Sequence, residues 1–125
     1  MSIDKIPGYS AAVSRLGPFS WGDFVTVRRL HVDQSQLPSG VGDYVVRLTV
    51  ASDQASTGRG LTLVAEGVTD LRISDWGGYE TRLIGLDCVD IAANQWEGKC
   101  WWIRDYENDM IHFYCRDLRI EHVER

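Results

Sequence analysis

The sequence predicts a mainly β protein, an antiparallel sheet folded as a sandwich or a partly open barrel with one or two short helices at most. Apolar and polar residues alternate with period two over residues 44–51 and again over Gly60–Glu66, as they do in half-buried strands. Two apolar, aromatic-rich runs flank the acidic turn at 107–109, which indicates a β-hairpin. The predicted strands recur about every 15 residues without a helical stretch of ten or more between them, which argues against a βαβ arrangement.

Chain-breaking residues delimit one short helix near the N-terminus. Pro7-Gly8 precedes the segment Tyr9–Leu16 and Gly17-Pro18 follows it. The sequence therefore predicts a helix over this segment, with Ser10 as its cap.

The first strand is predicted over residues 24–32, ahead of a turn-rich connection at 34–42. Its apolar positions change phase between Val27 and Leu30. An extra residue in a strand produces such a change, so we expect a bulge near Arg28-Arg29.

The remaining elements follow the same alternation. A strand containing Leu71 and Ile73 follows a break at Gly67, and another strand is predicted over 81–91. Three loops and a closing hairpin are predicted at 52–60, 75–79, 94–98 and 99–120. The inward positions of these strands form the predicted core: Val46, Leu48, Leu63, Leu71, Ile73, Ile84, Leu86, Trp102, Phe113 and Leu118.

Length and cysteine content indicate the class of protein. A chain of 125 residues fits a single β-rich domain, 1–125, that can bury one core. No stretch approaches the roughly 20 apolar residues of a membrane span, and the N-terminus lacks the features of a secretory signal. Three cysteines, an odd number, argue against a complete disulfide framework. We therefore expect a cytoplasmic protein.

The net charge of −5 is unevenly distributed along the chain. Residues 1–62 hold five acids and six bases, a net of +1, whereas residues 63–125 hold thirteen acids and seven bases, a net of −6. An acidic surface repels phosphate backbones, so nucleic acid is not an expected ligand. It attracts basic proteins and speeds their encounter. The alternative is a solvated acidic face that only keeps the protein soluble.

The residue types that catalyse reactions or bind metals form no recognised pattern. Cys88, Cys100 and Cys115 form no CxxC pair, and the three histidines complete no zinc spacing; small buried hydrophobic residues are the alternative. Asp87 and Asp90 lie three apart on one predicted strand and should face opposite ways, unlike a glycosidase pair. Calcium-type loops, nucleophile motifs and phosphate-binding glycine loops are absent from the sequence. We therefore expect no enzymatic activity, no cofactor and no metal.

The aromatic residues are the remaining functional candidates. Five tryptophans occur in 125 residues, and Trp101-Trp102 must place one ring on each face of its strand. Tryptophan beside acidic groups is common on protein-binding surfaces. A second core and a small ligand cavity lined by the same rings are the alternatives. The candidate partner-binding surface consists of acidic and aromatic groups in or beside the predicted turns: Trp76, Tyr79, Asp90, Trp96, Glu97, Asp105, Glu107 and Asp109.

Two apolar strand patterns stand out in the second half of the chain. Residues 61–73 read Leu-Thr-Leu-Val-Ala-Glu-Gly-Val-Thr-Asp-Leu-Arg-Ile, and residues 111–120 end in Phe-x-Cys-x-x-Leu-x-Ile, with a middle strand near 84–91. Over 61–120, about half of its length, the chain resembles bacterial immunity proteins of polymorphic toxin systems. The resemblance implies a small cytosolic β-rich protein that binds and neutralises a cognate toxin domain. It implies no particular functional residue.

The favoured interpretation is a non-enzymatic protein that neutralises a cognate bacterial toxin domain, with a basic toxin domain as its partner and neither nucleic acid nor membrane as a ligand. A small-molecule-binding β-barrel is the main alternative, and an enzyme ranks third. A protein-binding surface should be acidic and lack a deep pocket. A ligand carrier or an enzyme should have a deep apolar cavity with converging polar groups.

Overall fold

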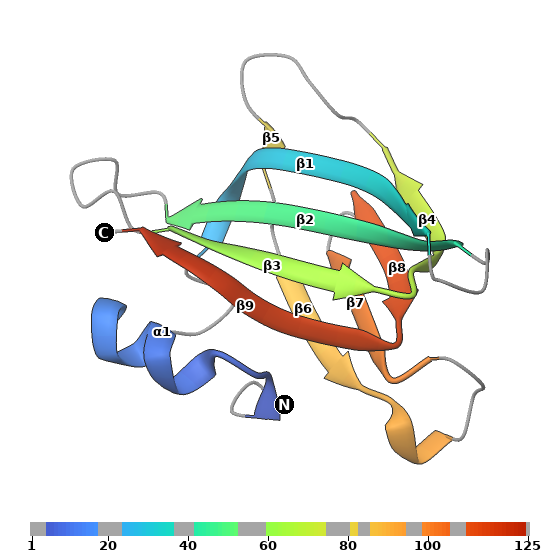
Figure 1. The fold of residues 1–125 in the computed structure, drawn as a ribbon. Helices are drawn as coiled ribbons and strands as arrows, with labels where there is room; N and C mark the ends of the chain where they lie inside the picture. Colours follow the sequence, from blue (N-terminus) through green and yellow to red (C-terminus); the bar gives the residue numbers. More distant parts are fainter. Residues whose placement is uncertain are drawn as a thin grey trace.

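The fold is that of a computed structural model, shown as a ribbon in Figure 1. The structure describes residues 5–17, 24–36, 42–52, 60–74, 81–82, 86–94, 99–105 and 110–124. These residues form the helix α1 (Tyr9–Leu16), the 3-10 helix η3 (Ala92–Asn94) and the strands β1 (Phe24–Gln36), β2 (Gly42–Ser52), β3 (Gly60–Glu66), β4 (Thr69–Ile73), β5 (Thr81–Arg82), β6 (Leu86–Asp90), β7 (Trp101–Asp105), β8 (Ile111–Cys115) and β9 (Asp117–Glu124). The predicted mainly β fold class is confirmed.

The strands form two antiparallel sheets packed as a sandwich. Sheet A has the order β5-β1-β2-β3-β9, and sheet B, which lies behind it in Figure 1, has the order β4-β8-β7-β6. Alternate residues of each strand point between the sheets and form a common core. Leu48 and Leu63 contribute to this core from sheet A, and Ile103 and Phe113 contribute from sheet B.

Two stretches of chain run through both sheets and bend together. Strand β3 passes through Gly67 into β4, and β8 passes through Arg116 into β9. The bends are adjacent, because the Arg116 N–H donates a hydrogen bond to the Glu66 carbonyl oxygen over 3.0 Å. The antiparallel part of the predicted hairpin is confirmed, since β7 pairs with β8. The expectation that its second strand continues to Ile120 in the same sheet is wrong, since β9 pairs with β3 of sheet A.

Helix α1 lies alongside β9 (Figure 1) and has the predicted bounds. The residue at its N-terminal cap is Gly8, with φ of +93°, and no side chain caps the helix, so the predicted capping role of Ser10 is wrong. A Cβ on Gly8 would collide with the backbone of Ile120, so only glycine permits this close approach.

Strand β1 confirms the predicted bulge. Its register with β2 shifts between Val27 and Arg29, which leaves Arg28 as the extra residue. The strand continues to Gln36, so the connection to β2 is shorter than the predicted 34–42. The predicted strand at 81–91 is two strands in different sheets, because β5 pairs with β1 whereas β6 pairs with β7.

Most of the described members of the predicted core are buried, namely Val46, Leu48, Leu63, Leu86, Phe113 and Leu118. Leu71 is half-buried and packs against them. Ile73 is 38% exposed, so its predicted burial is wrong; it ends β4, which forms an edge of sheet B. Trp102 is half-buried, so its predicted place in the core is wrong, and its neighbour Trp101 packs against the core in its stead. Ile84 lies outside the described residues.

Among the described elements, no helix combines the length and apolar composition that crossing a membrane requires. Cys88, Cys100 and Cys115 all carry free thiols. Cys88 and Cys115 are buried, as expected for small hydrophobic residues of a core.

Candidate functional site: the outer face of sheet B

The register of sheet B places two rows of side chains on its outer face. Arg72, His112, Arg104 and Asp87 are successive cross-strand neighbours from β4 to β6. The second row joins Tyr114 and Trp102 to their neighbours on β4 and β6, which are Thr69 and Val89. Residues directly opposite one another in antiparallel strands share a face. Ile103 and Phe113 alternate with these rows and point into the core.

Three rings form the centre of the outer face. Trp102 stacks on Tyr114 with ring centroids 5.9 Å apart and planes inclined by 24°. His112 meets both rings edge-on, at 5.8 Å from Trp102 and 5.1 Å from Tyr114. Stacked and edge-to-face rings stabilise each other through their quadrupoles, so the three side chains form a small ordered cluster. All three are half-buried and remain accessible.

Cations lie over this cluster. The Arg104 guanidinium lies 4.1 Å from the Trp102 ring centroid, and the Lys99 ammonium lies 4.7 Å from that of Tyr114. Both distances are within the range of cation–π attraction. Arg104 also lies 4.0 Å from a carboxylate oxygen of Asp87. The cations are thus fixed against the rings rather than extended into solvent.

Asp70 links the cluster to the edge strand β4. Its carboxylate lies 3.4 Å from the Lys99 ammonium, and its carbonyl oxygen lies 3.2 Å from Nδ1 of His112. Because a carbonyl only accepts, Nδ1 carries the proton and donates this hydrogen bond. Asp70 has a positive φ of 56°, and the register of β4 with β8 shifts between Thr69 and Arg72. Asp70 therefore lies in a β-bulge that turns its carbonyl toward the histidine.

The indole N–H of Trp102 is buried and has no hydrogen-bond partner among the described residues. An unsatisfied buried donor costs about 1–3 kcal/mol. Such groups are uncommon in native proteins, and they concentrate where function requires them.

The structure does not bring together the two predicted site residues that it describes. Asp90 pairs with Trp101 at one end of the β6–β7 ladder, whereas Asp105 pairs with Leu86 at the other. Asp90 has a local role, since its Oδ1 accepts a hydrogen bond from the Ala92 N–H over 3.0 Å. Its Oδ2 lies 3.9 Å from the Lys5 ammonium.

Asp105 is fully buried, at 0% exposure, which corrects the expectation that it belongs to an exposed partner-binding surface. It lies two residues after Ile103 and therefore shares the inward face of β7. The other members of the predicted surface lie outside the described residues, and they are Trp76, Tyr79, Trp96, Glu97, Glu107 and Asp109.

The cluster on the outer face was not predicted from the sequence, although the alternation of residues in β7 and β8 contained the necessary signal. Trp102 and Arg104 occupy alternate positions of β7, as His112 and Tyr114 do in β8. A hairpin with buried Ile103 and Phe113 must turn these four side chains to its other face.

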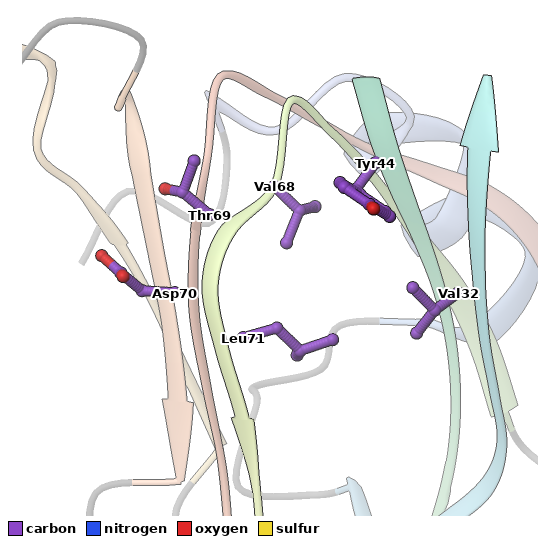
Figure 2. A pocket seen from close by; sticks show the side chains of 6 residues that line it. All are labelled: Val32, Tyr44, Val68, Thr69, Asp70 and Leu71. Atoms are coloured by element: carbon purple, nitrogen blue, oxygen red, sulfur yellow. The ribbon is translucent and has the colours of Figure 1, made fainter. Parts of the chain in front are cut away.

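A pocket of about 450 Å³ lies on the other side of β4. Figure 2 shows Val68 and Leu71 pointing across it toward Tyr44 and Val32. The side chains of Thr69 and Asp70, which also border it, turn the other way (Figure 2). The described lining therefore forms an apolar recess, and none of its side chains supplies the converging polar groups of a typical enzyme or small-molecule site.

In the described part of the chain, no group of three or more His, Cys, Asp or Glu side chains is arranged so that it could bind a metal ion. Burial raises the pKa of the Cys88 thiol well above its ordinary value, with Asp87 and Cys115 contributing. Burial likewise raises the pKa of Cys115 to about 12, with help from Asp117 and Cys100. Thiols with raised pKa values stay protonated and are poor nucleophiles near neutral pH, so these two cysteines are unsuited to nucleophilic chemistry there.

Comparisons with protein families, with curated proteins and with solved structures give no match for this chain.

Proposed function

We propose that the chain is a non-enzymatic binding protein whose outer face of sheet B contacts a partner protein. The observation that carries this proposal is the accessible cluster of Trp102, His112 and Tyr114 with Arg104 and Lys99 held over its rings. Tryptophan, tyrosine and arginine dominate the residues that contribute most to protein–protein affinity.

The cluster is also preorganised for binding. Arg104 and Lys99 are already positioned by the rings and by Asp87 and Asp70. Less side-chain entropy is therefore lost when a partner covers them. The buried N–H of Trp102, which has no acceptor among the described residues, also favours binding, because a partner that shifts the ring and supplies an acceptor would recover the energy of this hydrogen bond.

Charge acts at longer range than these contacts. The outer face itself carries Arg72, Lys99 and Arg104 against Asp70 and Asp87, so it is not acidic. The whole chain nevertheless has a net charge of −5. Its field therefore favours encounter with a basic protein, while the aromatic cluster supplies the short-range contact.

We further propose that the partner is a bacterial toxin domain and that binding neutralises it in the cytoplasm. The resemblance of residues 61–120 to immunity proteins supports this choice. The three free thiols fit a reducing compartment.

The test measures binding of the toxin domain encoded beside this gene to purified protein. We expect Trp102→Ala to weaken the affinity at least about 30-fold, the effect of losing about 2 kcal/mol at a central contact. Arg104→Ala combined with His112→Ala should also weaken it. Circular dichroism of each variant verifies that the fold is retained.

A matched control lies on the opposite sheet. His31 and Arg47 are cross-strand neighbours on the outer face of sheet A, as His112 and Arg104 are on that of sheet B. His31→Ala combined with Arg47→Ala should leave the affinity unchanged. If only this control pair weakens binding, the partner surface lies on sheet A. If no toxin domain from an adjacent gene binds at micromolar concentration, the neutralising function is wrong.

A further inference from the structure

Sheets A and B separate on each side of the shared bend. We call the space between an edge strand of one sheet and the opposite sheet a wedge, and there is one beside β4 and one beside β9. On one side, the β3–β4 stretch leaves β2, the partner of β3, after the Val68 N–H has donated to the Tyr44 carbonyl oxygen over 3.2 Å. On the other side, the β8–β9 stretch leaves β7, the partner of β8, where the Cys100 N–H donates to the Cys115 carbonyl oxygen over 2.9 Å. Each wedge exposes the edge of one strand, β4 in the first and β9 in the second.

The chain itself fills the wedge at β9. The Ile120 N–H of β9 donates a hydrogen bond to the Pro7 carbonyl oxygen over 2.8 Å. The neighbouring Ile6 inserts its side chain into the core and is only 2% exposed. Helix α1 then continues along β9 (Figure 1). A turn with one aliphatic anchor thus satisfies a backbone donor of the strand edge and covers the core at the same time.

The wedge at β4 is open in the described structure. In that part of the chain β4 pairs with β8 alone, so its other edge has no strand beside it. The apolar pocket of about 450 Å³ lies along this edge (Figure 2). Three exposed large hydrophobic residues of the described part of the chain lie here, since Val32 is 43% and Tyr44 51% exposed at the pocket, and Ile73 of β4 is 38% exposed.

We propose that the open wedge takes an extended segment of the partner protein, which pairs with the edge of β4 and places an aliphatic side chain in the pocket. This inference rests on the proposed protein-binding function and adds the way in which the partner binds. The filled wedge at β9 indicates that a backbone acceptor and an aliphatic anchor such as Ile6 suit such an edge. The edge of β4 that is unpaired in the described structure offers its hydrogen-bonding groups to an extended backbone. Strand addition of this kind gains affinity from main-chain hydrogen bonds and specificity from pockets for alternate side chains.

The wedge is continuous with the outer face of sheet B. Asp70 borders the pocket through β4, and its carboxylate contacts Lys99, which lies over the ring of Tyr114. One partner can therefore cover the aromatic cluster and extend a strand across β4. The short length of β4 and its bulge at Asp70 limit indiscriminate pairing with other strands.

The experiment selects peptides from a phage-displayed library of random decapeptides on the full chain and measures the affinity of the enriched sequences. We expect peptides with alternating apolar residues. Val32→Asn should weaken their binding about tenfold or more, because it places an amide in the pocket wall. Thr49→Asn, which places the same amide on the outer face of sheet A, is the control and should leave binding unchanged.

Backbone pairing is tested separately with two N-methylated forms of the best peptide, each methylated at alternate amides. Methylation of the amides that face β4 should abolish binding, and methylation of the opposite set should preserve it. Hydrogen exchange of residues 69–73 should slow when the unmethylated peptide binds.

Three results would overturn the inference: no enrichment of any peptide, equal binding to the Val32→Asn variant, or full binding by both methylated forms. The selection uses no toxin domain, so its failure is distinct from failure of the proposed neutralising function.

Discussion

Gly67 lies directly against the side chain of Arg116 where the two long strands bend together. A Cβ on Gly67 would lie 3.0 Å from the Arg116 Cβ and 3.3 Å from its guanidinium carbon. Gly67 also has φ of +68°, a conformation that residues with a side chain adopt only with strain. The bend that separates β3 from β4, and that opens the wedge beside β4, therefore depends on a residue without a side chain.

Gly67→Ala should reduce the free energy of unfolding by about 2 kcal/mol, since a left-handed φ costs about 1 kcal/mol and the contact with Arg116 adds to it. The control is Gly67→Ala in an Arg116→Gly background, which removes the side chain that the new Cβ would meet. There only the conformational cost of about 1 kcal/mol is expected. Urea unfolding measures both values. An equal loss in the two backgrounds would show that the contact at the bend is unimportant.

Phe113→Ala should reduce the free energy of unfolding by about 3–5 kcal/mol, enough to unfold a marginally stable domain. Phe113 is 1% exposed in the core between the sheets, so its removal leaves a cavity. Thermal unfolding followed by circular dichroism measures the effect. A melting temperature within about two degrees of that of the parent would contradict this position of the ring.

Stability should fall in alkali because of the buried thiols. The folded pKa of Cys115 is raised to about 12 by burial, with Asp117 and Cys100 contributing, against an ordinary value of 9.0. The folded state then keeps a proton that the unfolded state loses. This stabilising contribution is complete below about pH 9 and disappears as the pH rises toward about 12, at up to about 1.4 kcal/mol per pH unit for one thiol.

Urea unfolding between about pH 8 and about pH 11 measures this slope. Cys115→Ala should make the decline visibly shallower than that of the parent, whatever its stability at neutral pH. An unchanged slope in this variant would show that the Cys115 thiol titrates normally in the fold.

Local alternation sufficed to predict much of the fold. The helix between Pro7 and Gly17 and the bulge near Arg28 depend on interactions between near neighbours, and both appear where expected. The passage of β3 into β4 and of β8 into β9, from one sheet to the other, was not predicted. The spacing of apolar residues nevertheless lengthens from two to three positions between Ala65 and Val68, and again between Cys115 and Leu118. Such a phase change indicates a bend, but only pairing between distant strands shows that both bends coincide.

The candidate site was less predictable because it depends on which face of each strand is covered. Asp105 was assigned to a turn by its charge, yet its position two residues after Ile103 turns it inward. Trp101 and Trp102 are equally apolar, and only the register with β8 shows that Trp102 stacks on Tyr114 outside the core. Ile73 follows the core pattern but is exposed because β4 ends a sheet.

The central claim is that the outer face of sheet B is the partner surface, and hydrogen exchange of the complex with the toxin domain from the adjacent gene tests it most directly. Backbone amides of residues 99–105 and 110–115 should exchange more slowly in the complex than in the free chain, because the partner covers Trp102, Tyr114 and their neighbours. Amides of residues 45–51, in the middle of sheet A, should be unchanged. Slower exchange confined to sheet A, with β7 and β8 unaffected, would contradict the claim.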